Sequence, residues 1–536
     1  MNKLTGFLKG FAIDPRDNQG AFTYGEKEVY FLKQAETKTH IAKFVYNSND
    51  RVDARGAVDR FQNSANPTAG LGLKSLQEIK LFTRFSTESQ PIKKVKFTYD
   101  NSLCGDLPNA VGDVGKLTLK SVAIENGTGT QGSQNPYTFT YSSFNPSYSQ
   151  YSKDRWGNYK PALSNGESNI DWPYVDQRAE NESLQDLYAS AWNLSTITLP
   201  TKGMIKVDYE AGRYAYVQNQ QASSMAKMEL TGTERGEKLV YEFNPSTSAP
   251  KVKFKLDQPI NGTLSSALQK SEVLKYLDMD TKEVFVKLDI NLRKPQGNDF
   301  ELVEGYLKIN LNAPMTLVKD GSGNYVFGEF ELEKIDGVHP FAAMAWKHIE
   351  LDQPWAANMT KSFSQANSAK ERINLIRGLS GIVGSIRQTI EGFNDYCKNN
   401  NWGQEINLKK SGVRLFNADL NKIGGGHRVR QITIDDGWQH DVEGIYGQVY
   451  DYSKIEDGKL ISSGVSTFEP FVGGEENTLR KSKQYKELRK LRSNSNLYFE
   501  YPVNESLYPS PSVGYSEVKI LSLPSAKKAG YEILRK

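Results

Sequence analysis

Apolar and polar residues alternate along many short stretches of this chain. A period of two predicts a β-strand with one buried face, because successive side chains of a strand point to opposite sides. Nine stretches show it best: 93–100, 116–125, 137–141, 204–210, 251–257, 283–292, 304–311, 325–335 and 428–434. Glycine, asparagine and aspartate stand between them, as in the hairpin-like KDGSGN at 319–324. We therefore expect a mainly β protein of antiparallel sheets of short strands.

One segment departs from this pattern. Ser368 and Glu371 fit a capping box, in which each side chain satisfies a backbone N–H of the first helical turn. Apolar residues then recur three or four positions apart, from Ile373 to Phe393. The spacing predicts one amphipathic helix near 368–396, packed against β-rich regions. We expect a shorter helix before it, within 340–366.

The length of 536 residues is several times that of an average domain. From the spacing of the elements we expect four regions. They are a β-rich region at 1–220, a second at 221–360, a helical element at 361–400 and a β-rich region at 401–536.

The charge is nearly balanced, with 67 Lys and Arg against 63 Asp and Glu. A basic run at 480–492 is expected to be a solvated helix face or loop, so no nucleic-acid partner is predicted. No window approaches the roughly 18 apolar residues of a membrane span. Gly6, Lys9 and Gly10 interrupt the apolar start of the chain, and we recognise no signal peptide there.

Cys104 and Cys397 are the only cysteines, which excludes a cysteine-based zinc cluster and a dense disulfide framework. A single bridge between them and two buried free thiols both stay open, and their different surroundings favour the thiols.

Motifs of common enzymes are missing. The chain contains no G-x-S-x-G, no P-loop and no H-E-x-x-H. His427 and His440 have acidic neighbours, but exposed turn residues explain them more simply than a metal site. The glycines of 423–427 precede a strand and not a helix, which favours a turn over a phosphate site. We predict no catalytic residue, no metal and no cofactor.

Aromatic residues gather between 150 and 192. Such rings can stack on sugars, although internal packing is the commoner use. The candidate ligand-binding residues are Trp156, Tyr159, Trp172, Tyr174 and Trp192.

Several phrases resemble stretches of very large surface or secreted proteins of Bacteroidota bacteria. Among them are KKVKFTYDNSLCGDLPN (93–109), DRWGNYKP (154–161), KIGGGHRVRQITI (422–434) and ISSGVSTFEPFVGGEEN (461–477). Phrases of this kind run in order from about 20 to about 520. Those proteins are loosely similar to Rhs/YD-repeat proteins and to the shell-forming subunits of toxin complexes. The resemblance implies that the antiparallel sheets form YD-repeat-like or sandwich modules.

The resemblance implies a non-enzymatic β scaffold segment, with an Rhs-like shell for an effector as one form. Its partners would be other segments of a longer parent protein or an effector domain. It also implies an extracellular or cell-surface location, if the chain belongs to a longer exported protein. Two alternatives stay open: a carbohydrate- or surface-binding adhesin module, with glycans as partners, and a glycan-active hydrolase.

Overall fold

The computed structural model describes residues 28–54, 73–85, 90–108, 110–163, 167–229, 234–235, 238–242, 244–245, 247–292, 300–335, 337–352, 402–436, 445–483, 497–500 and 512–523. The protein is mainly β, with 46% strand against 10% helix, which confirms the expected class. The helix predicted near 368–396 lies outside the described residues.

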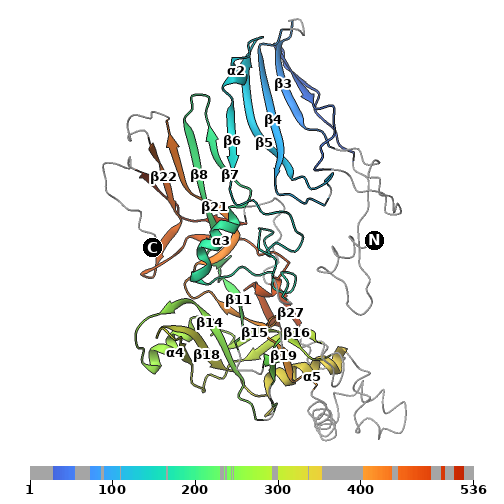
Figure 1. The fold of residues 1–536 in the computed structure, drawn as a ribbon. Helices are drawn as coiled ribbons and strands as arrows, with labels where there is room; N and C mark the ends of the chain where they lie inside the picture. Colours follow the sequence, from blue (N-terminus) through green and yellow to red (C-terminus); the bar gives the residue numbers. More distant parts are fainter. Residues whose placement is uncertain are drawn as a thin grey trace, which may run out of the picture.

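Eleven antiparallel strands form one large sheet, here called the upper sheet (Figure 1). In spatial order they are β1 (Gln34–Glu36), β2 (His40–Tyr46), β3 (Leu76–Thr83), β4 (Lys93–Leu103), β5 (Lys116–Asn126), β6 (Tyr137–Tyr141), β7 (Leu194–Thr198), β8 (Met204–Tyr214), β21 (Lys422–Asp435), β22 (Ile445–Asp451) and β29 (Lys519–Leu523). Two short helices accompany it, α2 (Gln131–Gln134) and α3 (Glu182–Ala189), with the 3-10 turn η1 (Ala179–Asn181) before α3.

A second group of strands forms the lower body (Figure 1). Its seven-stranded sheet holds β11 (Ser223–Lys227), β20 (Gly412–Phe416), β15 (Glu283–Ile290), β19 (Glu405–Asn407), β13 (Lys238–Glu242) and β12 (Glu234–Arg235), with β16 (Glu301–Lys308) paired to β15. A three-stranded sheet of β14 (Lys251–Ile260), β18 (Tyr325–Glu331) and β17 (Thr316–Lys319) lies with it. The helices here are α4 (Ser266–Leu274) and α5 (Pro340–Asp352), and α5 confirms the shorter helix expected within 340–366.

Smaller ladders complete the described chain. One has the order β10 (Gln220–Gln221), β9 (Tyr216–Val217), β25 (Gly464–Ser466) and β28 (Val513–Tyr515). The hairpin of β23 (Ser453–Glu456) and β24 (Lys459–Ser462) follows β22, and η3 (Gly474–Glu476) is a 3-10 turn. β26 (Arg480–Lys483) pairs with β27 (Leu497–Glu500). The basic run at 480–492 therefore begins as a strand, where we had expected a helix face or loop, because its first residues find a partner strand.

All nine stretches predicted from alternation are strands. They correspond to β4, β5, β6, β8, β14, β15, β16, β18 and β21. The expected hairpin at 319–324 joins β17 to β18, where the Asp320 carboxylate accepts hydrogen bonds from the backbone N–H groups of Ser322 and Asn324. Local turn chemistry thus places this hairpin as the sequence predicted.

The chain passes between the two bodies more than once within the described residues. It leaves the upper sheet after β8, builds the lower body from β11 to β20, and returns to pair β21 with β8. Only five residues separate the end of β20 at Phe416 from the start of β21 at Lys422. The four-region division stays a prediction, whereas in space the strands sort into these two bodies.

The main hydrophobic core lies in the lower body, where Val286, Leu288 and Ile290 of β15 are fully buried. The intervening residues of β15 are buried as well: Phe285 joins a second small core, and Lys287 and Asp289 bind polar partners. The alternation of β15 therefore marks two buried faces of different chemistry, and not one buried and one solvated face.

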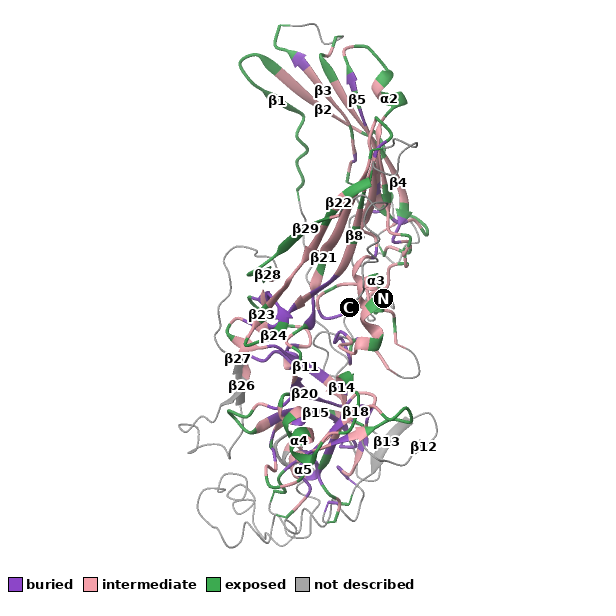
Figure 2. Ribbon diagram, turned by 90° about the vertical axis from the view of Figure 1, so that its left-hand side faces the viewer, coloured by how far each residue is buried: buried purple, intermediate pink, exposed green. Residues whose placement is uncertain are grey.

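The upper sheet is built differently. Figure 2 shows it as a single bowed layer, and most of its residues are only half-buried. None of the hydrophobic cores among the described residues includes a side chain of β2 to β7. Cys104, at the end of β4, is a buried free thiol, and Cys397 lies outside the described residues.

Candidate functional site

A cluster of buried charges lies where the upper sheet meets the lower body. The Arg155 guanidinium is 2.9 Å from the Glu469 carboxylate, and the Lys422 ammonium is 2.7 Å from the same carboxylate. Both cations also contact Glu476, Lys422 at 3.3 Å. These four side chains, here called the charge cluster, are 0–1% exposed. Two positive and two negative charges balance, which is the condition for keeping ions out of water.

Further hydrogen bonds hold the segment 469–477 around the cluster. Arg155 donates through Nε to the backbone carbonyl of Val472 and through Nη2 to that of Pro470. Glu476 accepts a hydrogen bond from the backbone N–H of Met225 in β11, and the Tyr214 hydroxyl of β8 donates to Glu469. The cluster therefore joins strands of both bodies to one loop.

The cluster strongly favours the ionised form of the Glu469 carboxylate. Burial by itself would raise the pKa of Glu469, but Lys422 and Arg155 outweigh it and hold that pKa well below its usual range. Burial and the charge of Glu469 raise the pKa of the Tyr214 hydroxyl. Tyr214 is thus held as a neutral donor to an anionic partner.

A second, largely buried ion pair continues the cluster into the lower body. Lys287 of β15 is 2.6 Å from Glu475, which also accepts a hydrogen bond from the Tyr174 hydroxyl. Burial would raise the pKa of Glu475, whereas Lys287 lowers it to about 2. Adjacent glutamates at 475 and 476 thus bind cations of three different segments.

The loop that carries Arg155 is shaped by its neighbours in DRWGNYKP. The Asp154 carboxylate accepts hydrogen bonds from the backbone N–H groups of Trp156 and Asn158, which closes a tight turn. Lys160 donates to the backbone carbonyls of Trp172 and Tyr174. Local polar contacts thus aim Arg155 into the cluster.

The glycines of 423–427 form an irregular part of β21. The ladder with β8 shifts register between Ile423 and His427, and Gly425 and Gly426 have φ of 84° and 103°. This segment lies inside the strand, whereas the sequence predicted a turn entering it. The bulge follows Lys422, which is the β21 residue that reaches the charge cluster.

The five aromatic candidates divide into separate packing groups. Tyr159 and Trp192 pack edge-on at 5.9 Å, in a group with Phe144 and Tyr188. Trp172 and Tyr174 pack edge-on at 4.8 Å and are 9% and 1% exposed. Trp156 packs on Tyr214 at 6.0 Å. The structure therefore does not bring the five rings together on one open platform.

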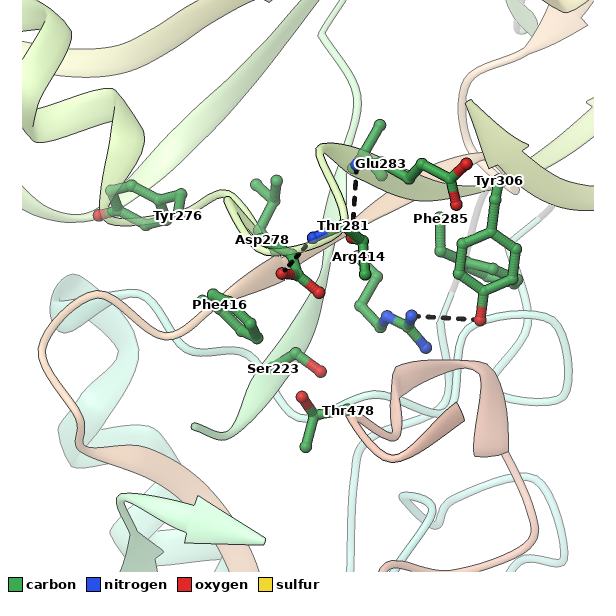
Figure 3. Close-up of a pocket in the computed structure, with 12 residues that line it drawn as sticks. Ser223, Tyr276, Asp278, Thr281, Glu283, Phe285, Tyr306, Arg414, Phe416 and Thr478 are labelled. Atoms are coloured by element: carbon green, nitrogen blue, oxygen red, sulfur yellow. Dashed lines mark hydrogen bonds between the residues drawn. The ribbon is translucent and has the colours of Figure 1, made fainter. Parts of the chain in front are cut away.

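A shallow pocket opens beside the cluster (Figure 3). Its lining includes Asp278, Glu283 and Arg414. Arg414 donates to the backbone carbonyls of Asn477 and Arg480 and to the Tyr306 hydroxyl. The Ser223 hydroxyl donates to the backbone carbonyl of Glu476, so it has no base as its hydrogen-bond acceptor. The lining mixes polar and apolar side chains, and these contacts do not form a nucleophile and base pair.

One more buried carboxyl lies nearby in the lower body. Asp257 of β14 accepts a hydrogen bond from the side-chain amide of Asn417 at 3.1 Å. Burial, followed by the nearby carboxylate of Asp419, raises the pKa of Asp257 to about 8. Asp257 is therefore largely protonated at neutral pH.

Metal and membrane features were also sought in the described part of the chain. No three His, Cys, Asp or Glu side chains gather there as metal ligands, and His440 lies outside it. No helix of that part is long and apolar enough to cross a bilayer.

Comparison of the chain with protein-family models and with curated proteins gave no match.

The charge cluster was not among the residues selected from the sequence. Its members nevertheless stand in three of the phrases that carried the resemblance, since Arg155 belongs to DRWGNYKP, Lys422 to KIGGGHRVRQITI and the glutamates to ISSGVSTFEPFVGGEEN. The sequence showed only that each phrase contains a charged residue. It did not indicate that these residues pair in space.

Proposed function

We propose that this chain is a non-enzymatic β scaffold segment of a large bacterial surface or secreted protein. The charge cluster is the observation that supports this most. It joins β8, β11 and β21 to the loop at 469–477, and its charged groups form ion pairs with one another. A catalytic acid or base must reach substrate, whereas these side chains are 0–1% exposed and pair with one another, which favours a structural role.

The resemblance to the Bacteroidota surface proteins supports the same proposal. The phrases that carry it supply the members of the charge cluster. A scaffold must hold its parts in fixed positions. The return of β21 and β22 to the upper sheet provides such a connection, since it ties that sheet to the lower body. The proposed partners are other segments of a longer parent protein or an effector domain, and the proposed location is the cell surface or the medium.

The test combines location with activity. Mass spectrometry of surface-shaved cells and culture medium should find peptides of this chain within a longer exported product. The purified chain should turn over none of a broad panel of glycosidase, esterase and peptidase substrates. Turnover that disappears in a folded Asp278→Asn/Glu283→Gln variant would establish an enzyme at the pocket and refute the proposal. Thr281→Ser, which changes the same pocket without removing a carboxylate, is the matched control.

The adhesin alternative has weaker support. Glycan-binding rings must present a face to solvent, and Trp172 and Tyr174 are buried. Binding of the wild-type chain to a glycan array, lost in Trp156→Ala but kept in Trp192→Phe, would favour that alternative.

A further inference from the structure

The pair Asn-Gly occurs three times in this chain, at 126–127, 165–166 and 261–262. The first and the third pair are both followed by threonine, so these two sites share the tripeptide Asn-Gly-Thr. The second pair lies outside the described residues. Two copies of one tripeptide in different surroundings allow the influence of the fold to be separated from that of the local sequence.

An asparagine followed by glycine can react with its own backbone. Glycine has no Cβ to shield its backbone nitrogen, which can therefore approach the asparagine side chain closely. After losing its proton, this nitrogen attacks Cγ of the asparagine. A C–N bond forms, the Cγ–Nδ2 bond breaks and ammonia leaves, which gives a five-membered succinimide ring. Water then opens the ring at one of its two C–N bonds, and the product is aspartate or isoaspartate.

The surroundings of Asn261 leave this reaction unhindered. Asn261 and Gly262 are exposed in the turn that joins β14 to α4 in the lower body (Figure 1). Within the described part of the chain, neither the Asn261 side-chain amide nor the Gly262 N–H forms a hydrogen bond. A Cβ placed on Gly262 would meet no atom within 4 Å. Both the nitrogen that attacks and the amide that leaves are therefore available.

The surroundings of Asn126 differ in one decisive contact. Asn126 is the last residue of β5 and lies opposite Lys93 of β4. The Gly127 N–H donates to the backbone carbonyl of Ile92 at 2.8 Å. Asn126 is exposed, and Gly127 has a positive φ and open space around it, as Gly262 has. The hydrogen bond holds the Gly127 nitrogen in the strand ladder, so it can react only when the bond opens.

We infer that Asn261 is a site of spontaneous deamidation through a succinimide and that the fold protects Asn126 from the same reaction. The aspartate product adds one negative charge to the turn before α4. The isoaspartate product also lengthens the backbone there by one carbon atom. This inference goes beyond the proposed function, because the reaction needs only water and takes place whether the chain is a scaffold, an adhesin or an enzyme.

The test is a time course on the full chain in warm, mildly alkaline buffer. Samples are digested, and mass spectrometry follows the small mass gain of an amide that becomes a carboxylate in the peptides that contain Asn126 and Asn261. Protein isoaspartate methyltransferase with labelled S-adenosylmethionine identifies the isoaspartate product. The same chain unfolded in urea is the control, and the incubation lasts until the unfolded chain has been converted at both sites.

In the folded chain, Asn261 should be converted at least about tenfold faster than Asn126, because only the Gly127 nitrogen must first break a hydrogen bond of the fold. In the unfolded chain, the two rates should agree within about threefold, since the two sites share their tripeptide and the fold no longer distinguishes them. Asn261→Gln should abolish the mass gain of its peptide and leave the circular dichroism unchanged. Its longer side chain would have to close a six-membered ring, and the wild-type side chain makes no hydrogen bond with the described residues.

Three results would overturn the inference. The first is a folded chain in which Asn261 stays unmodified while the unfolded chain reacts. The second is a folded chain in which Asn126 and Asn261 react at equal rates. The third is an unchanged mass gain in the Asn261→Gln variant, which would assign the reaction to another residue of the peptide.

Discussion

Arg155 and Glu469 lie 2.9 Å apart although 314 positions separate them in the sequence. Lys422 approaches the same carboxylate from β21, so one loop at 469–477 receives cations from two distant segments. Because these side chains are only 0–1% exposed, each charge depends on its partners. The predictions below follow from such dependences.

Removing one charge of the cluster should be costly. Glu469→Gln leaves Arg155 and Lys422 short of a buried anion and should lower the free energy of unfolding by about 3–5 kcal/mol. Urea denaturation followed by circular dichroism measures this change. Glu517→Gln removes an exposed partner of Lys519 and should cost less than about 1 kcal/mol. Equal losses for both variants would contradict a special role of the cluster.

Acid should destabilise the protein through Glu475. Its pKa is about 2 in the folded chain against an ordinary value of 4.5, so its contribution is complete above about pH 4.5 and is lost as the pH falls toward 2. The Glu475→Gln variant should therefore lose less unfolding free energy than wild type over that pH range. Thermal melts from pH 7 to pH 3 provide the measurement, and an unchanged acid limb in the variant would show that Glu475 does not contribute.

Raising the pH should destabilise the protein through Asp257, which is the opposite direction to the effect of Glu475. Its pKa in the folded chain is about 8, above the ordinary value of 3.8, so the folded chain keeps the proton to a higher pH than the unfolded chain does. The free energy of unfolding therefore falls as the pH rises from about 4 through 8. Asp257→Asn imitates the protonated form. The variant should be more stable than wild type by at least about 1 kcal/mol at pH 9 and show little gain at pH 4. A gain that is the same at both pH values would rule out titration of Asp257 as its cause.

Trp172 should act as a core residue. It is 9% exposed, packs on Tyr174 and contacts the backbone region of Gly412 closely. Trp172→Ala should cost about 3–5 kcal/mol of unfolding free energy, as expected for a large ring removed from a packed site. Leu187→Ala, at an exposed position of α3, should cost less than about 1 kcal/mol in the same denaturation experiment. A folded, fully stable Trp172→Ala variant that loses glycan binding would instead favour the adhesin alternative.

The strand pattern could be predicted from the sequence because it is a local property. Alternation in YTFTY placed β6, and the Asp320 turn placed the β17–β18 hairpin, without knowledge of any partner. Alternation could not show whether solvent or other parts of the protein lie against each face of a strand. In β15 it marked two buried faces, since Lys287 and Asp289 find polar partners, and in the upper sheet the apolar residues are mostly only half-buried.

The sequence by itself determined a mainly β chain, the strands, their turns and the absence of common enzyme motifs, because neighbours along the chain decide these features. Only the tertiary structure decided that Arg155, Lys422, Glu469 and Glu476 meet, that Trp172 and Tyr174 are packed inside, and that β21 returns to β8 across the whole lower body. The reason is physical. A charge or a ring is stabilised by what surrounds it in space, and register and chain crossing bring those surroundings together from segments that are hundreds of residues apart.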